Sequence, residues 1–310
     1  MNILVTGGAG FIGSHLTEEL LNQGHQVVVV DDLSSGSTSN LPLDSKLKFI
    51  QKDILSCSPG DIQIPIDAIA HLAAIPSVVS SWDEPVKSHT SNLSATVSVI
   101  ELCKRMNVSK VVFASSAAVY GDIDRIPISE QAPTRPISPY GLQKLASEDY
   151  LRLFTKHFNI SAVALRLFNV YGPRQRPDSA YSGVISIFSA AMRNNQSISI
   201  YGDGLQTRDF VFVKDVAKAF ALALTKQMDR GEFLVCNVAT AKKTSLLGLV
   251  EALRVNFPEW NSGIEFKPSR LGDILESQAD ISRAKEIGFH PEFDIMAGLE
   301  RLVRFEDVKV

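Results

Sequence analysis

The chain has 310 residues, of which 45% are hydrophobic and 21% charged, a composition typical of a globular protein and far from that of a disordered one. This length predicts one large domain with a smaller lobe. The formal net charge is −3 and the sequence contains no run of Lys or Arg, which argues against nucleic acid or an anionic membrane as the main partner.

Cysteine and histidine usage predicts neither disulfides nor a metal. The three cysteines, Cys57, Cys103 and Cys236, are scattered, and none of the six histidines pair at ligand spacing. The first residues enter a strand-like run without a signal-peptide pattern, and no apolar run reaches the about 18 residues of a membrane span. We therefore expect a cytoplasmic protein with reduced cysteines.

Short apolar runs alternate with helix-length amphipathic stretches through the first half of the chain. The expected strands are residues 3–5, 27–30, 47–50, 68–72, 111–115 and 162–167. This alternation is typical of βαβ units and predicts an α/β protein with a doubly wound parallel Rossmann sheet over residues 1–168.

The pattern changes after residue 169. Helices are expected near residues 183–193, 213–225 and 245–256, mixed with short strands. We interpret residues 169–310 as a smaller α/β C-terminal substrate lobe, with a return to the main domain near residues 205–240.

A glycine-rich turn joins the first strand to the first helix. It reads Gly7-Gly8-Ala9-Gly10-Phe11-Ile12-Gly13. Gly7 permits the tight turn, Gly10 lets the backbone approach a pyrophosphate, and Gly13 lets helix and strand pack closely. Amide N–H groups at the start of the helix would bind the phosphate charge. The alternative is a turn that merely connects strand to helix.

Acidic residues follow the next two strands. Asp31 ends the strand at 27–30, about 20 residues downstream of the turn, where a carboxylate accepts ribose hydroxyls. Asp31 and Asp32 would repel a 2′-phosphate, so the pattern favours NAD over NADP. Asp53 follows the third strand and is a candidate adenine contact, the alternative being an exposed loop carboxylate.

Three residues form a candidate catalytic group. Tyr140 and Lys144 are four residues apart, hence on one helical face, and a nearby cation lowers the pKa of a phenol from about 10 toward working pH. Tyr140 could then act as a general base, while Lys144 could also hold a nicotinamide ribose. Ser116 ends a predicted parallel strand and could align a substrate oxygen. The alternative for Ser116 is a helix cap.

With these residues the sequence resembles the extended short-chain dehydrogenase/reductase enzymes that act on nucleotide sugars, most closely the UDP-hexose 4-epimerases. The resemblance covers nearly the whole chain and rests on the glycine turn, residues 31–33, 53–54, 71–74, 168–174, 208–210 and 270–273, and the catalytic group. It implies NAD held through the cycle, hydride removal from C4, rotation of a 4-keto sugar and hydride return, with Tyr140 exchanging the proton. It also implies cofactor contacts at Phe11, Ile12, Ile54, Leu72, Ala73 and Ala74.

The resemblance also assigns substrate residues. Arg208 and Arg270 match positions that clamp the diphosphate, which suits guanidinium geometry, although either could be a surface residue. Asp273 matches the residue that binds the uridine ribose. Positions that line the sugar or uridine correspond to Ser77, Asn92, Asn169, Val184 and Tyr201.

Related reactions are disfavoured at identifiable positions. A 4,6-dehydratase of this family would carry an Asp-Glu pair after the catalytic hydroxyl, whereas Ala117 and Ala118 cannot act as acid and base. Asn169 favours a neutral hexose, while the likeness of residues 174–178 to glucuronate 4-epimerases keeps that substrate as an alternative. A ketoreductase would exchange NADPH, which Asp31 disfavours. An NAD-sensing scaffold of the same fold usually lacks a catalytic residue, whereas this chain has all three.

Ser277 addresses the substituent at C2 of the sugar. Glucose-restricted epimerases tend to have a bulky Tyr at this position, so a small residue leaves room for an N-acetyl group. We therefore hypothesise interconversion of UDP-GlcNAc and UDP-GalNAc, with UDP-glucose as a poorer or equal substrate. The family commonly dimerises through helices that match residues 92–106 and 141–158, so a homodimer is expected, although their apolar residues could equally be intramolecular core.

Overall fold

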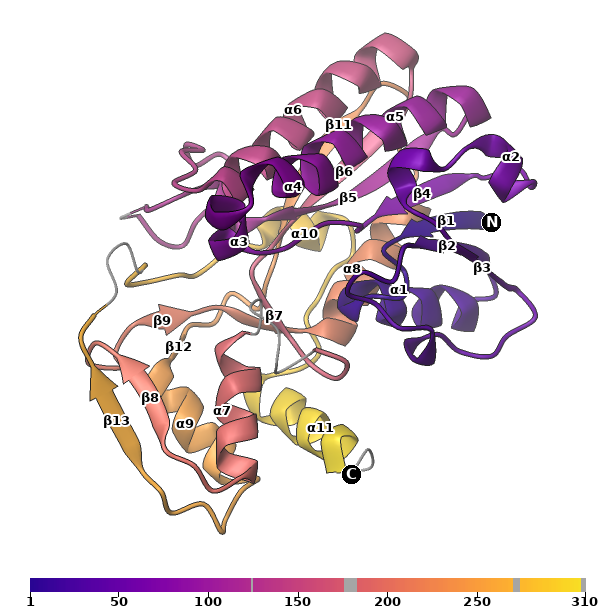
Figure 1. The fold of residues 1–310 in the computed structure, drawn as a ribbon. Helices are drawn as coiled ribbons and strands as arrows, with labels where there is room; N and C mark the ends of the chain where they lie inside the picture. The colour runs from indigo at the N-terminus through magenta and orange to yellow at the C-terminus, as the bar shows by residue number, and fades with distance from the viewer. Residues whose placement is uncertain (124, 176–182, 270–273, 308–310) are drawn as a thin grey trace.

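A seven-stranded parallel sheet forms the centre of the larger domain (Figure 1). The structure is a computed structural model that describes residues 1–123, 125–175, 183–269 and 274–307. The strand order is β11-β6-β5-β4-β1-β2-β3. The bounds are β1 (Asn2–Thr6), β2 (Gln26–Asp31), β3 (Leu47–Gln51), β4 (Ala68–His71), β5 (Lys110–Ser116), β6 (Ser161–Leu167) and β11 (Phe233–Val238). The predicted doubly wound sheet is confirmed, and its order reverses between β1 and β4, where open sheets bind ligands.

Helices cover both faces of this sheet, which is why its strands read as continuous apolar runs. On β1, Ile3 and Val5 pack into one core, whereas Leu4 between them packs into the other. The first core includes residues of α1 (Phe11–Asn22), α8 (Val213–Thr225) and α10 (Ser282–Glu286). The second includes residues of α2 (Pro59–Ile62), α5 (Ala95–Met106) and α6 (Pro139–Phe158).

The main domain also recruits later segments of the chain. Strand β11 extends the sheet beside β6, and α8 packs against α1. Both lie within the segment near residues 205–240 for which the sequence predicts a return. Short helices α3 (Val78–Asp83) and α4 (Pro85–His89) and a π-helical turn (Thr90–Ser94) lead into α5.

The smaller lobe has its own core and three two-stranded sheets (Figure 1). The pairs are β7 (Asn169–Tyr171) with β10 (Phe210–Phe212), β8 (Ile198–Tyr201) with β13 (Ile264–Lys267), and β9 (Thr207–Arg208) with β12 (Thr244–Ser245). Its helices are α7 (Val184–Arg193), α9 (Leu246–Arg254) and α11 (Ile295–Asp307). The lobe therefore folds around a separate apolar centre on one side of the main sheet.

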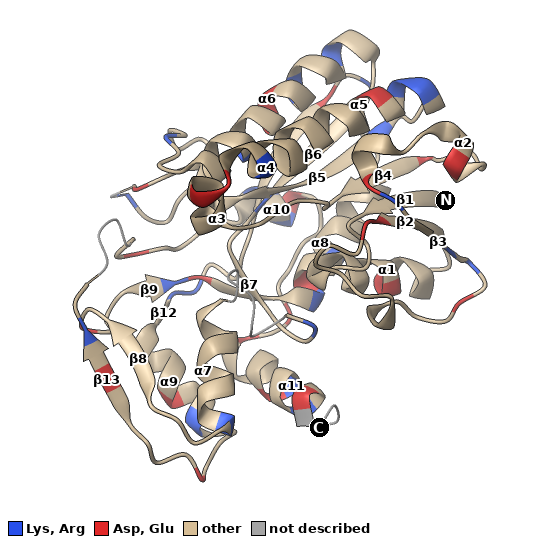
Figure 2. Ribbon diagram, in the orientation of Figure 1, with Lys and Arg blue, Asp and Glu red and all other residues tan. Residues whose placement is uncertain are grey.

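Charged residues of both signs are distributed over many elements (Figure 2). Within the described ranges, no helix is long and apolar enough to cross a membrane. The same part of the chain contains no cluster of three or more His, Cys, Asp or Glu residues suited to hold a metal ion.

Candidate active site

The glycine turn lies at the point where the strand order reverses and is shaped by close backbone contacts. Gly7 has a φ of +70°, and a Cβ atom there would lie 2.7 Å from the backbone nitrogen of Ala73. A Cβ atom at Gly13 would lie 2.1 Å from the carbonyl oxygen of Gly7. Side chains at these positions are sterically excluded, so the N-terminus of α1 stays open to a phosphate group.

Asp31 holds this turn in place. Its carboxylate accepts hydrogen bonds from the backbone N–H of Ala9 (2.9 Å) and of Leu33 (2.8 Å). Burial raises the pKa of Asp31, and these N–H donors act in the opposite direction. Asp32 is exposed and accepts from the N–H of Ser34. The ribose contact of Asp31 stays a prediction.

The carboxylate of Asp53 is exposed and accepts from the N–H of Leu55 (3.0 Å), which caps the 3₁₀ turn at Ile54–Ser56. This geometry matches the alternative of an exposed loop carboxylate, and an adenine contact stays a prediction. Ile54 itself is buried in the core beneath the sheet, so its side chain has a packing role.

A chain of buried polar groups supports residues 72–74. The hydroxyl of Thr6 accepts from the N–H groups of Leu72 and Ala73, both at 3.2 Å, so its proton points to Nδ1 of His71 at 2.8 Å. Nε2 of His71 then donates to the hydroxyl of Thr96 at 3.1 Å. Burial lowers the pKa of His71 to about 3, with the Lys144 charge adding to this effect, so the ring is neutral.

The two hydroxyls of the candidate catalytic group come from β5 and α6. Ser116 ends β5, and its Oγ accepts from the N–H of Ala118 (3.2 Å), the helix-cap role left open by the sequence. Tyr140 is the second residue of α6, a helix that starts at Pro139 and is capped by Ser138. A Cβ atom at Gly141 would lie 2.5 Å from the carbonyl oxygen of Ala118. The glycine after Tyr140 thus allows α6 to approach the segment that follows Ser116.

Lys144 lies one helical turn after Tyr140 and is 4% exposed. Its Nζ donates to the carbonyl oxygen of Ala114 (2.8 Å) and lies 4.8 Å from the centroid of the Phe113 ring and 5.8 Å from that of the Tyr140 ring. Strand β5 therefore holds the ammonium group beside the phenol, and the structure brings Ser116, Tyr140 and Lys144 together.

The pKa values correct one expectation. The sequence predicts a lowered pKa for Tyr140, but burial raises it, and the Ser116 hydroxyl acts against that rise. Burial also lowers the pKa of Lys144 to about 7, while the negative charge of Glu148 acts in the opposite direction. Desolvation therefore disfavours the charged form of Lys144 in this site.

Ser77 and Asn92 are buried and bonded within the protein. The hydroxyl of Ser77 accepts from the N–H of Ser80 (3.0 Å) and caps α3. The side chain of Asn92 accepts from the N–H of Ile75 (2.8 Å) and donates to Oε1 of Gln143 (2.7 Å). These contacts position the loop before α3, and a direct substrate contact by either residue stays a prediction.

The substrate lobe contains a cavity of about 690 Å³ lined in part by Tyr201, Phe266 and Lys267. Nζ of Lys267 lies 5.9 Å from the centroid of the Tyr201 ring. Ser116, Tyr140 and Lys144 do not line this cavity, so it is separate from the catalytic group.

Gln206 also lines the cavity and was missed by the sequence analysis. It is 8% exposed, and its Nε2 donates to the carbonyl oxygen of Tyr201 at 2.6 Å. Its Oε1 is buried without a hydrogen-bond partner in the described part of the chain, which is costly unless a ligand supplies a donor. Residues two apart in an extended segment lie on the same face, so the spacing of Gln206 from Arg208 could have indicated that both belong to one site.

The other predicted substrate residues are spread over the lobe. NH1 of Arg208 donates to the carbonyl oxygens of Thr207 (2.9 Å) and Ile274 (2.6 Å). Asn169 is exposed on β7, Val184 starts α7, and Ser277 is buried. Arg270 and Asp273 lie outside the described residues.

The fold and the site define a short-chain dehydrogenase/reductase type of enzyme, with a dinucleotide turn beside a Ser-Tyr-Lys group. The model of the NAD dependent epimerase/dehydratase family matches residues 3–239. The chain therefore belongs to the NAD-dependent epimerase/dehydratase family. The predicted family, fold class and NAD cofactor are confirmed.

Individual relatives resemble the chain over its whole length. A UDP-glucose 4-epimerase of Mycolicibacterium smegmatis is 39% identical, covering 98% of each chain. A putative UDP-glucose 4-epimerase of Methanocaldococcus jannaschii is 38% identical, covering 98% of this chain and 97% of the relative. The structure of a UDP-N-acetylglucosamine 4-epimerase from Methanobrevibacter ruminantium, in complex with UDP-N-acetylmuramic acid, matches with a TM-score of 0.94 and 38% identity, covering 100% and 99% of the two chains.

Proposed function

We propose that this protein inverts the C4 hydroxyl of a UDP-hexose, and that its preferred pair is UDP-GlcNAc and UDP-GalNAc. The observation that carries the reaction type is the joint placement of Ser116, Tyr140 and Lys144 at the carboxyl end of β5 and the start of α6. The residues after Ser116 are alanines, which favours a reversible redox cycle over elimination. The 4-epimerases among the relatives support the same reaction.

The residues of the turn fit NAD. Backbone atoms fill the space where side chains at Gly7 and Gly13 would lie, which leaves N–H groups at the start of α1 for the pyrophosphate. In this proposal Asp31, at the end of β2, accepts the ribose hydroxyls and repels a 2′-phosphate. When bound, NAD supplies the acceptor and donor of the C4 hydride.

Tyr140 takes the proton of the C4 hydroxyl and returns it after the 4-keto sugar has rotated to present its other face. Ser116 donates a hydrogen bond that aligns the same oxygen. Because burial disfavours the phenolate, Tyr140 needs nearby positive charge to lose its proton. Lys144 supplies that charge from the same helix. Its pKa of about 7 makes the charge sensitive to small changes around it.

The preference for an N-acetylated sugar rests on Ser277. This residue is 8% exposed and small, which suits a wall that accommodates a C2 substituent. The Methanobrevibacter ruminantium enzyme, named for UDP-N-acetylglucosamine, supports this choice. UDP-glucose is the second candidate, because several curated relatives are named for it and a larger space also admits the smaller sugar.

A uronate substrate is less favoured by the described residues. The glucuronate alternative draws on residues 174–178, and NH2 of Arg174 forms an ion pair with Glu18 of α1 at 2.9 Å. NH1 of Arg174 donates to the hydroxyl of Ser14 at 3.3 Å. These contacts direct the guanidinium toward α1, where it fastens the loop after β7 to the cofactor helix.

The cavity beside Tyr201 is our proposed site for the uridine end of the substrate. Gln206 and Lys267 line it together with the carboxylate of Asp203, and the Lys267 ammonium group suits a charged diphosphate. The clamp by Arg208, Arg270 and Asp273 is part of the same proposal.

We also propose a homodimer formed through α5 and α6. Ile100 and Leu151, two apolar residues of these helices, are 2% and 0% exposed and belong to the core. By contrast, Leu142 and Leu153 of α6 are 59% and 60% exposed. Covering them would remove apolar surface from water, which favours association.

Incubation with UDP-GlcNAc and, separately, UDP-glucose, followed by NMR identification of the products, tests the function. We expect UDP-GalNAc from the first without added nucleotide, and UDP-galactose at an equal or lower rate from the second. Turnover of UDP-glucose alone would refute the N-acetyl preference. A requirement for stoichiometric NADPH would refute the epimerase and support a ketoreductase.

A further inference from the structure

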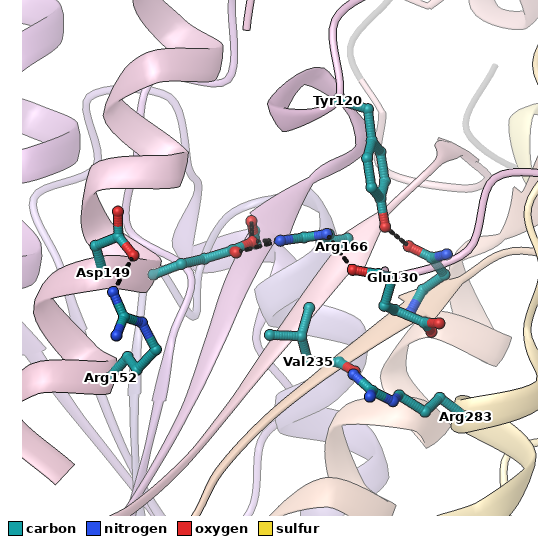
Figure 3. Close-up of polar contacts among 10 residues, drawn as sticks. Tyr120, Glu130, Asp149, Arg152, Arg166, Val235 and Arg283 are labelled. Atoms are coloured by element: carbon teal, nitrogen blue, oxygen red, sulfur yellow. Dashed lines mark hydrogen bonds and ion pairs between the residues drawn. The ribbon is translucent and has the colours of Figure 1, made fainter. Parts of the chain in front are cut away.

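A buried ion pair lies directly behind the catalytic residues. Arg166 of β6 and Glu148 of α6 have side chains that are 6% and 4% exposed, and NH2 of Arg166 lies 2.7 Å from Oε2 of Glu148. Nε of Arg166 donates to Oε1 of Glu148 at 2.9 Å, so the pair is bidentate. Figure 3 shows Arg166 extended between this carboxylate and the backbone of Glu130.

The pair is tied to the residue just before Ser116. The hydroxyl of Ser115 donates to Oε1 of Glu148 at 2.5 Å. Ser115 and Arg166 are also register partners on the adjacent strands β5 and β6. Glu148 therefore joins α6, one turn beyond Lys144, to the strand that ends in Ser116.

The pair is also tied to the segment just after Ser116. The guanidinium carbon of Arg166 lies 4.7 Å from the centroid of the Tyr120 ring, and the Tyr120 hydroxyl donates to Oδ1 of Asn237 at 2.6 Å (Figure 3). Ser116 is thus located between two residues, Ser115 and Tyr120, that both contact the ion pair. Tyr140 and Lys144 extend from the same helix as Glu148.

Stability alone is a weak reason for this arrangement. Removing two charges from water carries a large desolvation penalty, and well-packed apolar residues often stabilise a fold as well as a buried ion pair does. A bidentate ion pair fixes the relative orientation of the two elements that carry it, whereas a pair of apolar side chains does not. Proton transfer is sensitive to this orientation.

We propose that the Glu148–Arg166 pair, with Ser115, is a positioning device that holds Ser116 in register with Tyr140 and Lys144. This inference rests on the proposed roles of those three residues. Because Glu148 is 3% exposed, we expect it to act through its neighbours.

The pair also contributes to the electrostatics of Lys144. The groups that face this ammonium are Glu148 and Tyr140 on α6, the neutral His71 on β4 and the Phe113 ring on β5. Glu148 is the anion in this set and raises the pKa of Lys144 against the effect of burial. Its removal would lower that pKa and leave Arg166 as a second buried cation nearby.

The test compares Glu148→Gln with Asp149→Asn in the full-length protein. Asp149 is the next residue of the same helix, but its ion pair with Arg152 is exposed, with side chains 54% and 51% exposed, so it is a matched control (Figure 3). Turnover is measured with UDP-GlcNAc or UDP-glucose, whichever the wild type converts, and is normalised to bound NAD. We expect Glu148→Gln to lower kcat at least about tenfold with KM within about twofold of wild type.

The pH profile separates positioning from folding. With protonated Lys144 as the active form, kcat falls on the alkaline side of the pH profile, the alkaline limb, as Lys144 loses its proton. In Glu148→Gln the pKa of Lys144 is lower, so we expect this limb to shift to lower pH. In Asp149→Asn we expect no shift. A merely structural role would reduce the yield of NAD-bound protein and leave kcat per bound NAD and this limb unchanged. That result would overturn the proposal.

Ser115→Ala provides a second variant that keeps the ion pair. We expect a several-fold lower kcat with unchanged KM and an unshifted alkaline limb. If Glu148→Gln does not fold, Ser115→Ala decides: kcat within twofold of wild type overturns the proposal, and a several-fold loss supports it. If wild-type protein holds NAD but converts no UDP-sugar, the proposed function is wrong and this inference fails with it. If the wild type is active and the variants are unaffected, only the inference is wrong.

Discussion

At the glycine turn, backbone atoms define the proposed cofactor site, whereas in the smaller lobe side chains line the proposed substrate site. At Gly13 a single methyl group would lie 2.1 Å from a carbonyl oxygen, so this position requires glycine. The cavity beside Tyr201 has a volume of about 690 Å³, and its lining includes aromatic and amide side chains and charged side chains of both signs, Asp203 and Lys267. We therefore expect substitutions to alter substrate choice more readily than cofactor binding.

The relatives illustrate this difference. Proteins named for UDP-glucose and for UDP-N-acetylglucosamine match the chain at 39% and 38% identity, respectively, over nearly its whole length. Sequence identity therefore does not separate the two sugars, and individual lining residues must do so.

The largest effect is expected for Gly13→Ala. The added methyl group must displace either α1 or the Gly7 carbonyl, so purified protein should contain no NAD and show no turnover. Absorbance of extracted nucleotide measures the NAD content. Gly60→Ala is the control, because its nearest neighbouring atom would lie 3.7 Å away. Normal NAD content in Gly13→Ala would show that the turn is not the cofactor site.

Tyr140→Phe should retain NAD and lose about 10³-fold in kcat, within the range for loss of a general acid–base group. The ring still packs at the start of α6, so stability should change little. Steady-state kinetics with bound NAD as the reference checks this. Full activity in the variant would refute the assigned base.

Ser277→Tyr should reverse the substrate preference. Filling the proposed space should lower kcat/KM for UDP-GlcNAc about 10- to 100-fold and leave UDP-glucose within a few-fold, as expected for steric discrimination in a pocket. Ser277→Ala, which keeps the space open, is the control. Unchanged UDP-GlcNAc turnover in Ser277→Tyr would refute the role of this residue.

Gln206→Leu should raise KM for the UDP-sugar about tenfold with little change in kcat. The loss corresponds to one ligand hydrogen bond, about 1.4 kcal/mol. Titration with UDP alone gives the same comparison at equilibrium. An unaltered affinity for UDP would place the nucleotide outside this cavity.

The smallest effect concerns His71 and pH. Its folded pKa of about 3 lies below that of an unfolded histidine, about 6.5, so the unfolded chain binds the additional proton as the pH falls. The stability contribution is complete above pH 6.5 and is lost as the pH falls toward 3. Between pH 7 and 5.5, wild type should lose about 1 kcal/mol more unfolding free energy than His71→Asn, measured by urea denaturation. Parallel losses would contradict a neutral buried ring.

The sheet and the turn could be predicted because their signals are local. The strand at residues 27–30 and the glycines at 7, 10 and 13 follow from periodicity and spacing within short windows. Tyr140 and Lys144 are equally local. Their relation to Ser116 follows from the rule that parallel strands present their carboxyl ends at one edge.

What could not be predicted depends on contacts between distant residues. The direction of the Tyr140 pKa shift follows from burial, which requires knowing what packs over the ring. The Glu148–Arg166 pair joins a helix to a strand, and the orphan oxygen of Gln206 is defined only by its surroundings. Arg208 was predicted as a diphosphate ligand, and its bond to the carbonyl of Ile274 is visible only in three dimensions.

In the proposed function the C4 hydride leaves the sugar and returns to it without exchange, because NAD would stay bound, while Tyr140 moves the proton. Conversion of UDP-GlcNAc carrying deuterium at C4, followed by NMR and mass analysis of the UDP-GalNAc product, tests this most directly. We expect the deuterium to stay at C4 through many turnovers in ordinary water without added nucleotide. Loss of the label to solvent, or its transfer to added NAD, would contradict it.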